Sequence, residues 1–133
     1  MIQGGDCRAP ASLACLQYFK FSRYKDANAL FAQALTCDPD RMLVNALWLH
    51  FLTTHRPWLL PELHACQSHL NANKPGTRQL QPLVKALVHE LVDHDLPKAR
   101  DMYIVAMQSE SEPVMTRVLF GLFLMKMFEK HAL

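Results

Sequence analysis

The sequence predicts an all-α protein with about seven helices, and three observations carry that prediction. Apolar residues recur at steps of three and four along the chain, which places them on one face of a helix. Eight prolines divide the chain into segments of helical length, because proline disfavours helical geometry in the residue before it. No segment of four or more residues alternates cleanly as a half-buried strand does, and no Asn-Gly or Asp-Gly pair marks a hairpin.

Four helices are predicted in the first part of the chain. Their apolar stripes lie within residues 14–19, 27–35, 42–54 and 61–70. The third of these segments is apolar nearly all round, which predicts a buried helix.

Three further helices are predicted at residues 80–92, 99–107 and 114–133. The middle one opens with Asp95 as its predicted N-cap and with Pro97 in its first turn. The last contains eight consecutive apolar residues between Arg117 and Lys126, far fewer than the ~20 that span a bilayer. We therefore expect it to cap the fold or to bind a partner.

The composition predicts a single globular domain over residues 1–133. Half of the residues are hydrophobic and 20% are charged, and a chain of this length can bury a core of its own. The formal net charge is only +2 and the basic residues are scattered, so neither nucleic acid nor a membrane is expected as a partner. The first residues lack the pattern of a secretory signal, so we expect a cytoplasmic protein whose four cysteines are thiols.

An internal repeat organises most of the chain. Residues 24–39 align without a gap with residues 96–111, an offset of 72 positions or two units of 36. In this alignment a small–aromatic–small pattern meets its equivalent: Ala27, Phe31 and Ala34 match Ala99, Tyr103 and Ala106. Three helix pairs are therefore predicted, at about residues 8–41, 42–79 and 80–113, followed by the helix at 114–133.

This pattern resembles the tetratricopeptide repeat, a helix-turn-helix unit of about 34 residues. The first unit carries the resemblance through Tyr18, Tyr24, Ala27, Phe31, Ala34 and Pro39. The third unit keeps the small–aromatic–small pattern but has Ser111 in place of the closing proline. The middle unit departs from the pattern, with Leu63, Gln67 and Leu70 at the matching positions. The resemblance implies a right-handed stack of helix pairs.

Tetratricopeptide arrays bind other proteins in a concave groove lined by the first helix of each unit. Carried over to this chain, the resemblance implies an apolar groove for an amphipathic or hydrophobic helix, which is either a partner's helix or the chain's own C-terminal helix. Its residues would be Leu16, Phe19, Lys20, Leu43, Ala46, His50, Val84, Val88, Leu91 and Val92.

The leading hypothesis is a non-enzymatic adaptor or chaperone without a cofactor. Three units and a final helix in a small chain resemble the tetratricopeptide-type chaperones of bacterial type III secretion, which implies a secretion substrate as partner. The alternative is a structural subunit of a hetero-oligomer, docked through the last helix by Val118, Leu122, Phe123 and Met127.

Two motifs were weighed for metal or enzyme chemistry. The segment from His89 to His94 nearly matches a zinc-protease helix, but its second histidine lies off the required face, so a His89–Asp93 pair is expected instead. A further alternative is a zinc-binding protein that uses His50, His64, Cys66 and His69. No nucleophile elbow or glycine-rich phosphate loop occurs in the sequence.

Overall fold

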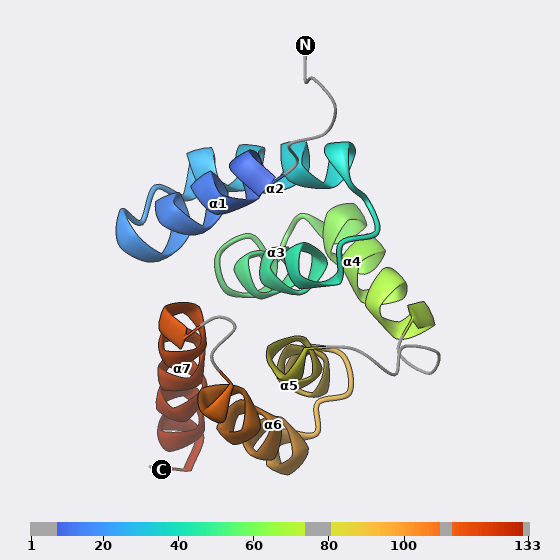
Figure 1. Cartoon of the computed structure of the whole chain (residues 1–133). Helices are drawn as coiled ribbons and strands as arrows, with labels where there is room; N and C mark the ends of the chain where they lie inside the picture. Colours follow the sequence, from blue (N-terminus) through green and yellow to red (C-terminus); the bar gives the residue numbers. More distant parts are fainter. Residues whose placement is uncertain (1–7, 74–80, 110–112, 132–133) are drawn as a thin grey trace. The chain divides into compact units, whose positions relative to one another are not determined.

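The computed structural model describes residues 8–73, 81–109 and 113–131, and this part of the chain is entirely helical. It contains seven α-helices and one π-helical segment (Figure 1). They are α1 (Arg8–Cys15), η1 (Leu16–Lys20), α2 (Tyr24–Cys37), α3 (Met42–His55), α4 (Leu60–Asn73), α5 (Pro82–Leu91), α6 (Leu96–Gln108) and α7 (Pro113–His131). The predicted all-α class is confirmed. None of these described helices combines the length and the apolar character needed to cross a membrane.

The chain divides into two compact units, Met1–Arg78 and Gln79–Leu133. In the first unit α1 packs against α2, α2 against α3, and α3 against α4. In the second unit α5 packs against α6, and α6 against α7. A stack of tetratricopeptide-like repeats within one domain stays a prediction.

The helix starts follow the prolines and one capping carboxylate. Pro82 and Pro97 lie in the first turns of α5 and α6, where a missing N–H costs no helical hydrogen bond. Asp95 is the N-cap of α6, and its Oδ1 accepts a hydrogen bond from the Lys98 amide at 3.2 Å. The predicted cap is therefore confirmed.

The turn between η1 and α2 has the same backbone geometry as the turn between α5 and α6. Ser22 and His94 have φ of 53° and 55°, and they are the positive-φ non-glycine residues of the described chain. Two backbone hydrogen bonds close the first turn. The Phe21 amide donates to the Leu16 carbonyl at 3.2 Å, and the Arg23 amide donates to the Gln17 carbonyl at 2.8 Å. In the second turn the Asp93 amide donates to the Val88 carbonyl at 3.0 Å, and the Asp95 amide donates to the His89 carbonyl at 2.8 Å. Each donor and each acceptor of the second turn lies 72 residues after its equivalent in the first turn, which is the offset of the sequence repeat.

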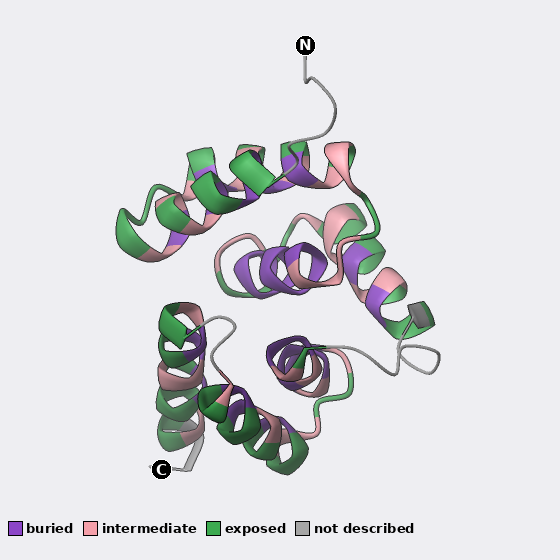
Figure 2. Cartoon of the chain, viewed as in Figure 1, coloured by how far each residue is buried: buried purple, intermediate pink, exposed green. Residues whose placement is uncertain are grey.

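The cores of both units use the aligned residues. In α2 the buried face is Ala27, Phe31 and Ala34, and in α6 it is Ala99, Tyr103 and Ala106. The alanines let neighbouring helices approach, and the aromatic ring between them fills the space. Figure 2 shows buried residues along α3, where Val44 to Leu52 are all buried, as its apolar circumference predicts.

The cysteines differ from the prediction of four thiols. Cys37 is disulfide-bonded, whereas Cys15 and Cys66 are thiols. The prediction is therefore wrong for Cys37, because spacing along a sequence does not reveal which sulfurs a fold brings together. Cys7 lies outside the described residues.

Candidate functional site

The helix α7 has two apolar faces that differ in exposure. Its inner face buries Thr116, Leu119 and Phe123. Its outer face leaves six large apolar side chains exposed: Val114, Val118, Leu122, Leu124, Met125 and Phe128. Two of them are mostly exposed, Met125 at 60% and Phe128 at 77%. A helix that is apolar all round is normally buried all round, so the outer face of α7 is the candidate functional site.

Aromatic rings hold the inner face of α7 against α6. The Phe120 ring stacks on Tyr103 at 5.4 Å between centroids with the planes 12° apart, and the Phe123 ring lies 5.1 Å from Tyr103. Both distances fall in the favourable range for aromatic pairs. The inner face is therefore committed to the core of its own unit.

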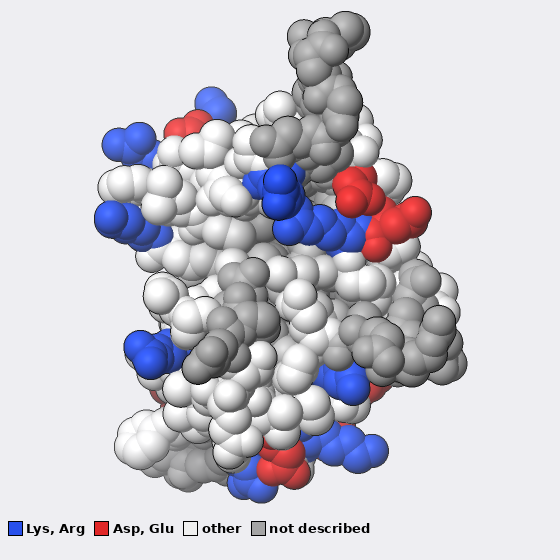
Figure 3. Space-filling model, in the orientation of Figure 1, with Lys and Arg blue, Asp and Glu red and all other residues white. Residues whose placement is uncertain are grey.

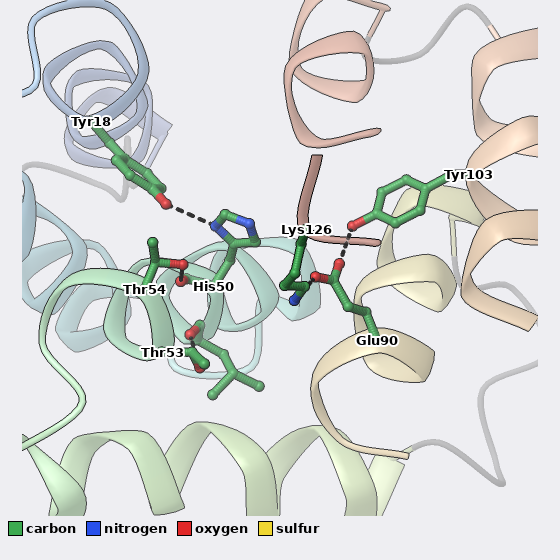
Figure 4. Close-up of polar contacts among 8 residues, drawn as sticks. Tyr18, His50, Thr53, Thr54, Glu90, Tyr103 and Lys126 are labelled. Carbon is green, nitrogen blue, oxygen red and sulfur yellow. Dashed lines mark hydrogen bonds and ion pairs between the residues drawn. The ribbon is translucent and has the colours of Figure 1, made fainter. Parts of the chain in front are cut away.

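A buried polar cluster adds a second attachment between α7 and the helices beneath it. Glu90 of α5 is only 3% exposed, and its Oε1 accepts a hydrogen bond from the Tyr103 hydroxyl at 2.6 Å. Its Oε2 pairs with the ammonium of Lys126, which reaches in from α7 (Figure 4). Burial, and then the neighbouring Glu90 carboxylate, raise the pKa of Tyr103 well above 10.0. The carboxylate is thus satisfied by one neutral donor and one cation.

Among the described residues the outer face has no such attachment, and it is hollowed near its end. A shallow hollow of about 350 Å³ is lined by Leu124, Met125, Phe128 and Glu129. Three of these four residues are apolar, so the hollow suits an apolar side chain from another helix.

Gly121 lies in the middle of the outer face. A Cβ built there meets no atom within 4 Å, so packing among the described residues does not require glycine. Glycine inside a helix costs roughly 0.5–1 kcal/mol relative to alanine. A surface that approaches α7 from outside would give this glycine a use.

The predicted groove residues are mostly inside the two units. Leu16 and Lys20 are exposed, and Phe19, Leu43 and Val92 are half-buried. The other five, Ala46, His50, Val84, Val88 and Leu91, are buried. Figure 4 shows His50 directed at Tyr18, whose hydroxyl oxygen lies 2.8 Å from His50 Nδ1. The groove itself stays a prediction.

The predicted residues of the last helix separate between its two faces. Val118 and Leu122 belong to the outer face, whereas Phe123 is buried and Met127 is half-buried. Sequence reasoning did not select Val114, Leu124 and Phe128. A projection at 100° per residue groups all three on one face, within a quarter turn of Gly121, but only the structure shows that this face is exposed.

The histidines do not assemble a metal site among the described residues, where no group of three or more His, Cys, Asp or Glu could hold an ion. The four residues of the zinc alternative all lie in this part of the chain. The expected His89–Asp93 pair is confirmed, with Nδ1 3.1 Å from Oδ2. His55 stacks on Tyr24 at 3.9 Å between centroids, and burial together with Arg56 holds its pKa below 6.5.

In the part of the chain that the structure describes, the fold is all-helical and the outer face of α7 is an exposed apolar surface. No family model matches the chain, and no match was found among curated proteins or solved structures.

Proposed function

We propose that this chain is a non-enzymatic protein–protein interaction module that docks a helical partner surface through the outer face of α7. The observation that carries the proposal is the row of exposed apolar side chains on a helix whose opposite face is already packed. Exposed apolar patches with a polar surround are typical of interaction sites. The polar surround is mixed in charge, and on the face shown in Figure 3 the Lys and Arg side chains are dispersed among uncharged ones.

The energetics favour a helix as the partner element. Covering a fully exposed Leu, Met or Phe side chain contributes about 1.5–3 kcal/mol, and the outer-face residues start from partial exposure. Six such residues can offset a cost of association in the lower part of its range of about 4–15 kcal/mol. A partner helix would present its own apolar stripe at the same spacing of three and four residues.

The architecture supports a tetratricopeptide-like repeat protein as the scaffold. Two of the three helix pairs share the same turn, with Ser22 and His94 at equivalent positions. They also bury the same small–aromatic–small pattern in their second helices. An adaptor or chaperone, including one for a type III secretion substrate, is compatible with such a scaffold.

The exposure pattern favours docking through α7 over docking in the predicted groove. Half of the groove residues are buried, so they are not available to a partner without movement of the residues that cover them. The outer face of α7 needs no such movement. Of the functions predicted from sequence, the subunit docked through its last helix is therefore the one that we favour.

The test is capture of partners by the tagged chain from its native cells, followed by mass spectrometry. Leu122→Asp places a charge on the outer face, and Ile104→Asp on α6 is the matched control, because the two residues are 40% and 43% exposed. We expect Leu122→Asp to lose the partners and Ile104→Asp to keep them, with unchanged circular dichroism for both. Retention of all partners by Leu122→Asp overturns the proposal.

A further inference from the structure

The geometry of α7 points to a second copy of this chain as the occupant of its outer face. We propose that two α7 helices cross in antiparallel directions, about a two-fold axis near residue 123. This inference rests on the proposed function, because it assumes that the outer face is the docking surface.

The central row of the outer face is complementary to itself when reversed. The row consists of Arg117, Gly121, Met125 and Glu129, spaced by four residues so that they form one ridge of the helix. From its N-terminal end the row presents a cation, a small residue, a large residue and an anion. In the reversed row of a second copy the anion therefore meets the cation, and the large residue meets the small one. A two-fold axis at residue 123 sets Arg117 beside Glu129 of the second copy and Met125 over its Gly121.

The two end charges of this row are available for such pairing. Arg117 and Glu129 are both exposed, and neither takes part in an ion pair with another described residue. Each charge of one copy would meet its opposite, and the symmetry makes every such contact twice.

The rows on either side of the ridge also match under the same axis. Val118 and Leu122 lie on one side of the ridge, and Leu124 and Phe128 lie on the other. Because the axis keeps each side row on its own side, it brings Leu122 beside Leu122 of the second copy and Leu124 beside its Leu124.

The crossing angle that this arrangement needs is a common one. Rows spaced by four become parallel when the two helices cross at about −50°, the most frequent crossing angle in globular proteins. Gly121 near the crossing point allows the backbones to approach closely, which accounts for glycine at a position with open space around it. A parallel pair would instead place Arg117 beside Arg117 and leave Gly121 facing Gly121.

The experiment measures the mass of the full chain by sedimentation velocity at low ionic strength, up to about 100 µM, where micromolar association is detected. We expect the wild type to reach the mass of a dimer. Arg117→Glu and Glu129→Arg each create two like-charge contacts across the axis, so each should raise the Kd about ten-fold or more. The double variant reverses both charges and should restore the wild-type Kd.

Two further variants control for folding and position. Gly121→Leu adds a large side chain at the point where the two backbones approach, so we expect a monomer. Helicity should be unchanged, because a Cβ at this position meets no atom of its own unit within 4 Å. Arg100→Glu reverses an exposed charge on α6 and should leave the mass unchanged.

The proposal is overturned by a wild type that stays monomeric over this range, or by a double variant as weak as either single variant. If the wild type is monomeric while Leu122→Asp still loses captured partners, the outer face binds a different protein. That outcome keeps the proposed function and removes only the second copy as occupant.

Discussion

Replacing Tyr103 with phenylalanine tests the buried cluster that attaches α7 to its unit. The substitution removes the hydroxyl that donates to Glu90 and keeps the ring that stacks on Phe120. Tyr103 is 0% exposed and Glu90 is 3% exposed, so water cannot easily replace the lost donor. A hydrogen bond to a charged group contributes about 1.5–3 kcal/mol. Because Lys126 still pairs with the carboxylate, we expect the free energy of unfolding to fall by about 2 kcal/mol.

The assay is urea unfolding at neutral pH, combined with a double-mutant cycle. Glu90→Met replaces the carboxylate with an apolar side chain of similar size, so Tyr103→Phe in that background no longer orphans a charge. In that background the buried Tyr103 hydroxyl has no acceptor, so its removal should be neutral or stabilising, which gives a coupling free energy of at least about 2 kcal/mol. Tyr24→Phe is the control, because the Tyr24 hydroxyl makes no hydrogen bond among the described residues, and its cost should be within about 0.5 kcal/mol.

Equal costs of Tyr103→Phe in the wild-type and Glu90→Met backgrounds would refute this reasoning. So would a cost in the wild type no larger than that of the Tyr24 control. Either result would mean that the carboxylate gains little from the hydroxyl and that Lys126 alone satisfies it.

Four other predictions concern the first unit. Burial and Arg56 lower the pKa of His55, so the stability it contributes is complete above pH 6.5 and declines below it; His55→Phe should unfold with a weaker acid dependence. Burial and then Glu62 raise the pKa of Cys66 from 9.0 to about 12. In the native protein Cys66 should therefore resist alkylation near pH 8, while the half-buried Cys15 reacts. Peptide mass mapping of the alkylated protein measures both. Above pH 9.0 the wild type should lose stability faster than Cys66→Val, by up to about 1.4 kcal/mol per pH unit. Phe31→Ala empties a fully buried site and should cost about 3–5 kcal/mol in urea unfolding.

Local chemistry explains what the sequence could predict. The prolines and the Asp95 cap set helix starts through the backbone alone, so they need no knowledge of distant residues. The small–aromatic–small pattern of α2 and α6 predicts a buried face because its spacing fits one side of a helix.

Long-range chemistry explains what the sequence could not predict. Glu90 stands 72 positions after Tyr18, where the repeat pattern places an aromatic residue, and its burial depends on donors from α6 and α7. Likewise, apolar spacing cannot distinguish the two faces of α7, since both read as core. Only the position of Tyr103 decides that Phe123 is inside and Leu122 is outside.

The paired turns at Ser22 and His94 have a consequence for the design of chimaeras from this chain. Both residues adopt the left-handed backbone conformation although neither is glycine, and equivalent amide-to-carbonyl hydrogen bonds close each turn. The conformation of each turn therefore depends on its backbone hydrogen bonds more than on its side chains. Residues 21–23 and 93–95 are then exchangeable parts, because this exchange leaves the buried side chains of Tyr18 and Glu90 in place. A chain that carries either three-residue turn in both places should close its helix pairs equally well.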